Sequence, residues 1–284
     1  MEPPERHAWD WIEFHWERND GKQRLTVKLK NKVAIVTGAG RGIGEATALA
    51  LAQEGALLVL ASRTSSELDR VVARTEDLGG EASIVVGDVS HRDDVERIVD
   101  ETLARHGRID MLVNVAGIYG PIGLTSEVDV DEWFRAIEVN LFGTFLCSRL
   151  ALPHMINQRS GKGINFSGGG ATSPLPRFSA YGVSKAAVVR YTETLAEEMK
   201  GFNIQVNAVA PGMVDTRLQD AALASGDRAG DFAAAARQLR LTGKGGVPPR
   251  ASGQIGGFPR FYRRRRVDWK ADCCSLRRFG VLGR

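Results

Sequence analysis

Short, apolar, β-branched runs alternate with longer amphipathic stretches from about residue 32 to about residue 212 of this 284-residue chain. This alternation is typical of a parallel β-sheet covered by α-helices on both faces. The predicted strands are Val33–Thr37, Leu57–Ala61, Ser83–Val86, Met111–Val115, Ile164–Phe166 and Ile204–Ala210. The predicted helices lie near Ile43–Glu54, Glu67–Leu78, Asp93–His106, Asp131–Gln158 and Ala180–Lys200. The sequence therefore predicts an α/β fold with one doubly wound parallel sheet in a single domain.

The formal net charge of +4 is unevenly distributed along the chain. The segment from Pro249 to Arg284 contains nine Arg and one Lys against two Asp, a net charge of +8, which leaves −4 for residues 1–248. The basic excess therefore belongs to a tail, and the remaining chain shows no basic face that indicates nucleic-acid binding. With 43% apolar and 25% charged residues, the composition also excludes a disordered or collagenous protein.

The cysteine content and the lengths of the apolar runs indicate the cellular compartment of the protein. Two of the three cysteines are adjacent, at Cys273 and Cys274, which is neither a disulfide framework nor a metal-ligand spacing. No apolar run approaches the roughly 20 residues of a membrane span, and the acidic start lacks the features of a secretory leader. We therefore expect a cytoplasmic protein with no metal and no membrane partner.

A glycine-rich loop follows the first predicted strand and opens the first predicted helix. In this loop Gly38 allows a tight turn, Gly42 allows close approach of a pyrophosphate, and Gly44 allows close packing of helix and strand. The N–H groups at the helix start face the phosphates. The alternative is a glycine-rich turn without a ligand, but the flanking strand and helix favour a Rossmann-type dinucleotide site.

Tyr181 and Lys185 are four residues apart in a helical pattern, so both side chains lie on one face of the helix. A nearby ammonium favours the phenolate, so we expect Lys185 to lower the pKa of Tyr181 toward the working range of an acid–base catalyst. Taken alone, such a pair is more often a surface pair. Behind a dinucleotide loop it indicates a catalytic role.

Five motifs in order resemble the short-chain dehydrogenase/reductase family over roughly residues 30–220. They are the glycine loop with three residues between its first two key glycines, Asn114-Val115-Ala116-Gly117 with Val115 in place of the usual Asn, Asn140, Tyr181-x-x-x-Lys185, and Pro211-Gly212. The resemblance implies a nicotinamide coenzyme, a small carbonyl or alcohol substrate, and a homodimer or homotetramer. It also implies coenzyme contacts by Gly38, Arg41, Gly42, Ile43, Gly44, Ser62, Arg63, Asp88, Val89, Asn114, Ala116, Gly117, Tyr181, Lys185, Pro211, Gly212, Val214 and Thr216.

The catalytic set implied by the resemblance is Tyr181, Lys185, Ser167 and Asn140. Asn140 would hold a water in a proton relay to Lys185; the alternative is a helix-interior Asn bonded to nearby backbone. Ser167 stands fourteen residues before Tyr181, whereas the family pattern more often places its Ser thirteen before, at the position of Gly168. Ser167 is our candidate for binding the substrate oxygen, and Ser173 is the alternative.

The choice between NADP and NAD follows from charge at the end of the second predicted strand. That strand ends Ala61-Ser62-Arg63, without the acid that usually binds the ribose 2′-hydroxyl of NAD. Ser62, Arg63 and Arg41 can bind a 2′-phosphate. The sequence therefore favours NADP and leaves NAD open; the alternative is that both arginines are solvated surface residues.

Both ends of the chain depart from this pattern. Residues 1–26 are expected to form an irregular extension, 27–248 the NAD(P)-binding catalytic domain, and 249–284 an atypical basic tail. The Ala-rich run Asp220–Leu241 suits a helical lid, but no terminal strand is visible after it. The tail is a nucleic-acid or anionic-surface segment, a solvated tail without a role, or, as we prefer, out-of-frame sequence. A missing strand would expose a sheet edge and puts the oligomer in doubt.

Together these features predict an oxidoreductase that transfers a hydride between NADP(H) and a ketone or secondary alcohol. The pocket loops Ile118–Glu127 and Gly168–Phe178 carry mostly small or apolar side chains, which suits a moderately hydrophobic substrate. The alternative is a dinucleotide-binding protein without turnover, either a sensor or an inactivated homologue. A nucleic-acid-binding module depends on the Arg tail alone and is not favoured.

Overall fold

The computed structural model describes residues 28–214 and 216–242. Within these residues six parallel strands form one sheet in the order β3-β2-β1-β4-β5-β6. The strands are β1 (Val33–Thr37), β2 (Leu57–Ser62), β3 (Glu81–Val86), β4 (Met111–Asn114), β5 (Gly161–Phe166) and β6 (Ile204–Val209). The strand order reverses between β1 and β4, and ligands of open α/β sheets bind at the carboxyl ends of the strands at such a point. The predicted doubly wound parallel sheet is confirmed.

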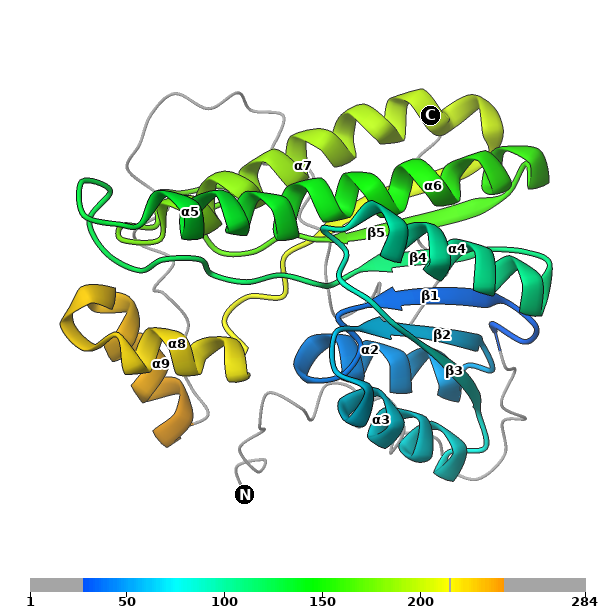
Figure 1. Ribbon diagram of the computed structural model, residues 1–284, viewed down its shortest axis with the longest axis horizontal. Coiled ribbons are helices and arrows are strands. Elements are labelled where there is room, and N and C mark those ends of the chain that lie inside the picture. The colour runs from blue at the N-terminus through cyan, green and yellow to red at the C-terminus, as the bar shows by residue number, and fades with distance from the viewer. Residues whose placement is uncertain (1–27, 215, 243–284) are drawn as a thin grey trace, which may run out of the picture.

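Helices cover both faces of this sheet (Figure 1). On one face lie α2 (Gly42–Gln53) and α3 (Ser65–Asp77), and on the other lie α4 (Arg92–His106), α6 (Gly143–Gln158) and α7 (Ser179–Met199). The other helical elements are α5 (Val130–Ile137), η1 (Glu138–Phe142), η2 (Lys200–Phe202), α8 (Arg217–Ala224), η3 (Gly226–Ala229) and α9 (Asp231–Thr242). None of the described helices is long and apolar enough to cross a membrane.

The strands are apolar on both faces because both faces are covered. All five residues of β1 are buried. Ile35 packs into the core beneath α4, α6 and α7, whereas Ala34 and Val36 pack into the core beneath α2 and α3. A strand buried on both sides reads as a continuous apolar run, which is why these strands could be located in the sequence.

Two elements differ from their predicted form. The helix predicted over Asp131–Gln158 contains a π-helical turn, η1, between α5 and α6. β5 begins at Gly161, three residues before the predicted start, because Gly161 and Lys162 already pair with Ile204 and Gln205 of β6, and glycines at 161 and 163 leave no apolar run there. A Cβ atom on Gly161 would lie 2.6 Å from Sδ of Met155, and one on Gly163 would lie 3.0 Å from Cγ1 of Val206.

The lid predicted over Asp220–Leu241 is helical, formed by α8, η3 and α9. In Figure 1 these yellow and orange helices lie at the left, beyond the carboxyl ends of the strands. Within the described residues β3 and β6 are the two edges of the sheet. The predicted extension at 1–26, the basic tail at 249–284 and the question of a terminal strand lie outside the described residues.

Candidate active site and coenzyme crevice

The glycine loop between β1 and α2 has no room for a side chain at Gly38 or at Gly44. Gly38 and Gly42 have φ angles of 63° and 56°, in the left-handed region that favours glycine. A Cβ atom on Gly38 would lie 2.8 Å from Cα of Ala116, and one on Gly44 would overlap the carbonyl of Gly38. α2 begins directly after this loop, next to the point where the strand order reverses. The N–H groups at its start can bind phosphate there.

Two other loops close on the glycine loop. Thr37 Oγ1 accepts hydrogen bonds from the amides of Val115 (3.1 Å) and Ala116 (3.3 Å), which fixes the loop after β4. From the loop after β6, Cγ2 of Thr216 would lie 3.4 Å from a Cβ atom on Gly42. Pro211, Gly212 and Val214 belong to that same loop. The structure thus brings together three predicted coenzyme-binding segments that are far apart in the sequence.

The carboxyl end of β2 carries an unpaired polar atom. Ser62 Oγ is buried and has no hydrogen-bond partner among the described residues. A buried polar group without a partner lowers the stability of a protein, so this hydroxyl is expected to bind a polar group of a ligand. Arg41 Nη1 lies 3.1 Å from Glu67 Oε1, and Arg63 Nη1 lies 3.7 Å from Asp88 Oδ2. Both arginines are thus paired with carboxylates, and the acid Glu67, which the sequence did not predict here, comes from α3.

Asp88 and Val89 follow β3 and are held by different means. Burial opposes the ionisation of Asp88, but hydrogen bonds from Ser90 and the charge of Arg135 outweigh it and lower the pKa of the carboxyl. Arg135 Nη2 lies 2.6 Å from Asp88 Oδ2. The Val89 side chain packs against Gly143, on which a Cβ atom would lie 2.7 Å from Cγ2 of Val89. Val89 is therefore a core residue, and only its main chain is available to a coenzyme.

The side-chain amide nitrogen of Asn114, at the end of β4, takes part in a hydrogen-bond network within the sheet. This nitrogen, Nδ2, donates to Asn165 Oδ1 (2.9 Å), and Asn165 Nδ2 donates to Thr192 Oγ1 (2.9 Å), so β4, β5 and α7 are connected. Ile43 packs into the core on the other face. The glycines and the unpaired Ser62 hydroxyl fit a dinucleotide, and so does Asn114 Oδ1, which is also buried without a hydrogen-bond partner among the described residues. Ile43 supports the loop that would bind it.

Lys185 is buried at the carboxyl end of the sheet. Its Nζ donates to the carbonyl of Phe166 (2.8 Å) and lies 5.8 Å from the ring centroid of Tyr181. Burial lowers the pKa of Lys185 to about 8. A Cβ atom on Gly117 would lie 3.3 Å from this Nζ and 3.1 Å from Asn140 Oδ1, so three of the predicted residues converge.

The pKa of Tyr181 is shifted in the opposite direction to the one predicted from Lys185. Burial raises the pKa of Tyr181 to about 12, although Lys185 is close. The prediction that Lys185 lowers this pKa is therefore wrong for the free protein, because loss of solvation outweighs an ammonium that lies beside the ring. The Tyr181 hydroxyl makes no hydrogen bond to any described residue, so it is free to bind a substrate oxygen.

Asn140 is fully buried in the π-helical turn and holds the loop after β4. Its Oδ1 accepts from the amide of Ile118 (2.8 Å), and its Nδ2 donates to the Ile118 carbonyl (2.8 Å) and to Ser184 Oγ (2.9 Å). Ser184 Oγ in turn donates to the Tyr181 carbonyl (2.8 Å). The side chain thus bonds to the backbone of a distant loop and not to its own helix, and it connects that loop to the helix that carries Tyr181.

Ser167 is buried directly after β5, and its hydroxyl is bonded to main chain. Its Oγ donates to the carbonyl of Lys185 (3.2 Å). Gly168 lies next to the reactive hydroxyl instead, since a Cβ atom there would overlap Tyr181 Oη and lie 2.9 Å from Cζ. The role of Ser167 as the donor to the substrate oxygen stays a prediction, and its hydroxyl would have to leave the Lys185 carbonyl to fill it. The loop between Ser167 and Tyr181 is one residue longer than the family spacing, and the position that faces Tyr181 is therefore Gly168, which has no side chain. Ser173 lies half-buried farther along the same loop.

Tyr181 belongs to an aromatic cluster whose members the sequence did not identify. The Tyr119 ring lies 4.8 Å from Tyr181, 5.2 Å from Phe178 and 5.8 Å from Phe232, measured between centroids. Phe232 belongs to α9, so the lid packs on the aromatic wall of the site. Tyr119 and Phe178 lie within the two loops that the sequence indicated as pocket walls. Phe232 could not be placed, because nothing in the sequence shows where the lid folds.

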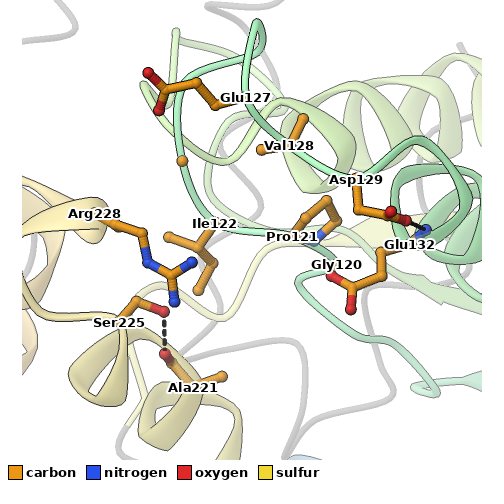
Figure 2. Close-up of a pocket in the computed structure, with 11 residues that line it drawn as sticks. Gly120, Pro121, Ile122, Glu127, Val128, Asp129, Glu132, Ala221, Ser225 and Arg228 are labelled. Atoms are coloured by element: carbon orange, nitrogen blue, oxygen red, sulfur yellow. Dashed lines mark hydrogen bonds between the residues drawn. The ribbon is translucent and has the colours of Figure 1, made fainter.

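Next to this cluster is a cavity of about 420 Å³ between the loop after β4 and the lid (Figure 2). Its buried floor is formed by Pro121 and Ile122. Figure 2 shows the Arg228 side chain pointing toward Ile122 on the lid side, with Glu132 on the opposite side. Tyr181 is not among the lining residues, so this cavity adjoins the aromatic cluster and is not itself the reacting position.

Comparison with known proteins agrees with this geometry. Residues 32–225 match the model of the short chain dehydrogenase family. The 3-oxoacyl-acyl-carrier-protein reductase of Thermotoga maritima is 39% identical over 68% of this chain and 78% of its own length. A metagenomic short-chain oxidoreductase solved in complex with NADP is 36% identical, with a TM-score of 0.63 over 70% of this chain and 92% of that one. An NAD+-bound xylitol dehydrogenase is 35% identical, with a TM-score of 0.63 over 64% of this chain and 70% of that one.

The family match covers the glycine loop, the buried Tyr181 and Lys185, and the sheet that positions them. Over the same residues the sheet is parallel and its strand order reverses at the glycine loop. The chain belongs to the short-chain dehydrogenase family, whose members are NAD(P)-dependent oxidoreductases acting on CH–OH and C=O groups.

Proposed function

We propose that this protein reduces a moderately hydrophobic ketone with NADPH, with Tyr181 as the proton donor. The observation that carries the proposal is the unpaired Tyr181 hydroxyl, on a ring whose centroid lies 5.8 Å from Nζ of buried Lys185 and which packs in the aromatic cluster. A raised pKa keeps this hydroxyl protonated at neutral pH, as a general acid for reduction requires.

The nicotinamide coenzyme, when bound, supplies the hydride. Tyr181 Oη donates its proton to the substrate oxygen as negative charge develops there. Lys185, with a pKa of about 8, is largely protonated at pH 7 and is positioned by the Phe166 carbonyl to restore the Tyr181 proton. Asn140 holds the loop at Ile118, so that the crevice keeps its shape during the reaction.

The preference for NADP is supported by Arg41, Arg63 and the unpaired Ser62 hydroxyl at the carboxyl end of β2. A 2′-phosphate requires positive charge and donors at this position. A relative solved with NADP is in line with this, while one solved with NAD+ indicates that the same fold accepts either coenzyme.

The substrate class follows from the side chains around Tyr181. The Tyr119 ring packs edge-on against the Tyr181 ring, and Phe178 and Phe232 pack against Tyr119, so the surroundings of Tyr181 on this side are aromatic. An apolar wall with one hydroxyl donor suits a ketone with a hydrophobic substituent. The chain's similarity to a 3-oxoacyl-acyl-carrier-protein reductase is compatible with this class. A cytoplasmic homodimer or homotetramer remains our expectation.

Tyr181→Phe tests the proposed function. The ring and its packing are kept, so the variant should bind NADPH with unchanged Kd and lose kcat by a factor on the order of 10² to 10⁴. Tyr191→Phe is the matched control, because Tyr191 lies on the same helix away from the aromatic cluster. NADPH oxidation with a panel of ketones measures kcat, and coenzyme fluorescence measures Kd. Full turnover by Tyr181→Phe would contradict the proposal.

A further inference from the structure

Glu67 is the centre of a charged cluster that joins three separate parts of the chain. Its Oε1 accepts hydrogen bonds from Arg41 Nη1 and from Arg217 Nη1, both at 3.1 Å. Arg41 belongs to the glycine loop, Glu67 to the first turn of α3, and Arg217 is the first residue of α8 in the lid. One carboxylate therefore connects the lid to the coenzyme crevice.

The same carboxylate lies over the unpaired hydroxyl of Ser62. A Cβ atom on Gly40 would lie 2.9 Å from Ser62 Oγ, 2.9 Å from Cβ of Glu67 and 3.2 Å from Glu67 Oε2. Ser62 Oγ and Glu67 thus share one face of Gly40. Three hydrogen-bond donors, on Arg41, Arg217 and Ser62, are gathered around a single negative group at the end of β2.

The backbone beneath this cluster is fixed. Arg70 Nη2 donates to the Gly40 carbonyl (3.0 Å) and to Glu45 Oε2 (3.0 Å), and Arg74 also pairs with Glu45. A ligand that enters the cluster is therefore accommodated by exchange of side-chain partners and not by movement of the loop.

We propose that Glu67 is a displaceable counter-ion that sets coenzyme choice and that Arg217 is a 2′-phosphate ligand carried by the lid. The inference rests on the proposed function. A phosphate monoester carries nearly two negative charges at pH 7, against one on Glu67. The side chains of Arg41 and Arg217 are 50% and 69% exposed, and exposed ion pairs contribute little to stability. The 2′-phosphate of NADP(H) therefore displaces Glu67 and binds both guanidinium groups and Ser62, whereas NAD(H) leaves the Glu67 bridges in place.

Coenzyme fluorescence titrations of the full-length protein test this assignment without requiring turnover. Arg217→Ala should raise the Kd for NADPH about tenfold, as expected for loss of one charge-assisted contact, and leave the Kd for NADH within about twofold. Glu67→Gln removes the competing charge and should lower the Kd for NADPH several-fold without affecting NADH. Arg190→Ala is the matched control, since Arg190 pairs with Glu193 on α7, outside the cluster.

The outcomes separate this inference from the proposed function. Wild-type protein that binds neither coenzyme would contradict both. Wild-type protein that binds NADPH, with an unchanged Kd in Arg217→Ala, would overturn the role of Arg217 alone. Weaker NADH binding by Glu67→Gln would show that Glu67 binds the ribose 2′-hydroxyl, and would overturn its role as a displaceable counter-ion.

Discussion

The backbone of Gly168 lies directly against the hydroxyl of Tyr181, with no space between them for a side chain. The position that faces the reactive oxygen from the β5 loop is therefore occupied by main chain. Ser167, one residue earlier, donates its hydroxyl to the Lys185 carbonyl. The position of the Tyr181 hydroxyl thus depends on the absence of a Cβ atom at residue 168.

Gly168→Ala should lower kcat by a factor on the order of 10², because the added methyl displaces Tyr181 Oη from its place by more than a catalytic site tolerates. The matched control is Gly169→Ala, whose Cβ atom would meet only Cδ2 of Leu175 at 3.8 Å, an ordinary contact. Steady-state kinetics compares the two variants. Equal effects of both substitutions would show that the loop, and not the contact with Tyr181, is responsible.

Ser167→Ala should leave kcat within a few-fold of the wild-type value. The hydroxyl that is removed bonds to a helix carbonyl, so the expected cost is a loss of about 1 kcal/mol in the free energy of unfolding. A residue that stabilised the substrate oxyanion would instead cost a factor on the order of 10² to 10³ in kcat. Urea unfolding and kinetics on the same variant distinguish these roles, and a large loss of kcat would support Ser167 as the oxyanion donor.

The fold was largely predictable because strands buried on both faces, such as β1, leave an unmistakable apolar run, and glycines mark the turns after them. What escaped prediction depends on contacts between distant segments. The π-helical turn at Asn140 accompanies its bonds to Ile118, 22 residues away. The early start of β5 depends on the pairing of Gly161 with Ile204 of β6, which no local pattern contains.

In the site, too, local spacing was predictable and contacts between distant segments were not. The spacing of Tyr181 and Lys185 placed both residues on one helical face, as the structure has them. The direction of the Tyr181 pKa was wrong, because a sequence shows that a charge is near but not that solvent is excluded. Glu67 and Arg217 are separated by 150 positions, so their contact could not be inferred before the lid was placed.

Asn140→Ala should destabilise the protein by about 2–4 kcal/mol. The substitution leaves the amide and the carbonyl of Ile118 without their partners in a partly buried environment. Urea unfolding measures the loss, and a higher Kd for NADPH should accompany it, because the loop after β4 borders the crevice. Thr194→Ala is a suitable control, since its hydroxyl bonds to its own helix at an exposed position. A stability loss no larger than that of the control would contradict this role.

Lys185 should make the stability of the protein depend on pH in the alkaline range. Its pKa is about 8 in the folded state, against 10.5 for a solvated lysine, so the unfolded chain binds more protons between these values. The free energy of unfolding should therefore contain a term that rises with pH from about 8 toward 10, by on the order of 3 kcal/mol when complete. Below pH 8 both states are protonated, and the cost of burying the charge is constant.

The measurement is the difference in unfolding free energy between the wild type and Lys185→Met at several pH values. The raised pKa values of Tyr181 and Cys147 lower stability at high pH, but they contribute to both proteins and cancel in the difference. Loss of the bond to the Phe166 carbonyl adds an offset that does not vary with pH. At pH 7 the variant should gain from removal of the buried charge, and its advantage should shrink steadily as the pH rises to 10. A difference that stays constant from pH 7 to pH 10 would show that the Lys185 ammonium is not destabilised by burial, and Lys185 would then remain fully charged throughout the working range.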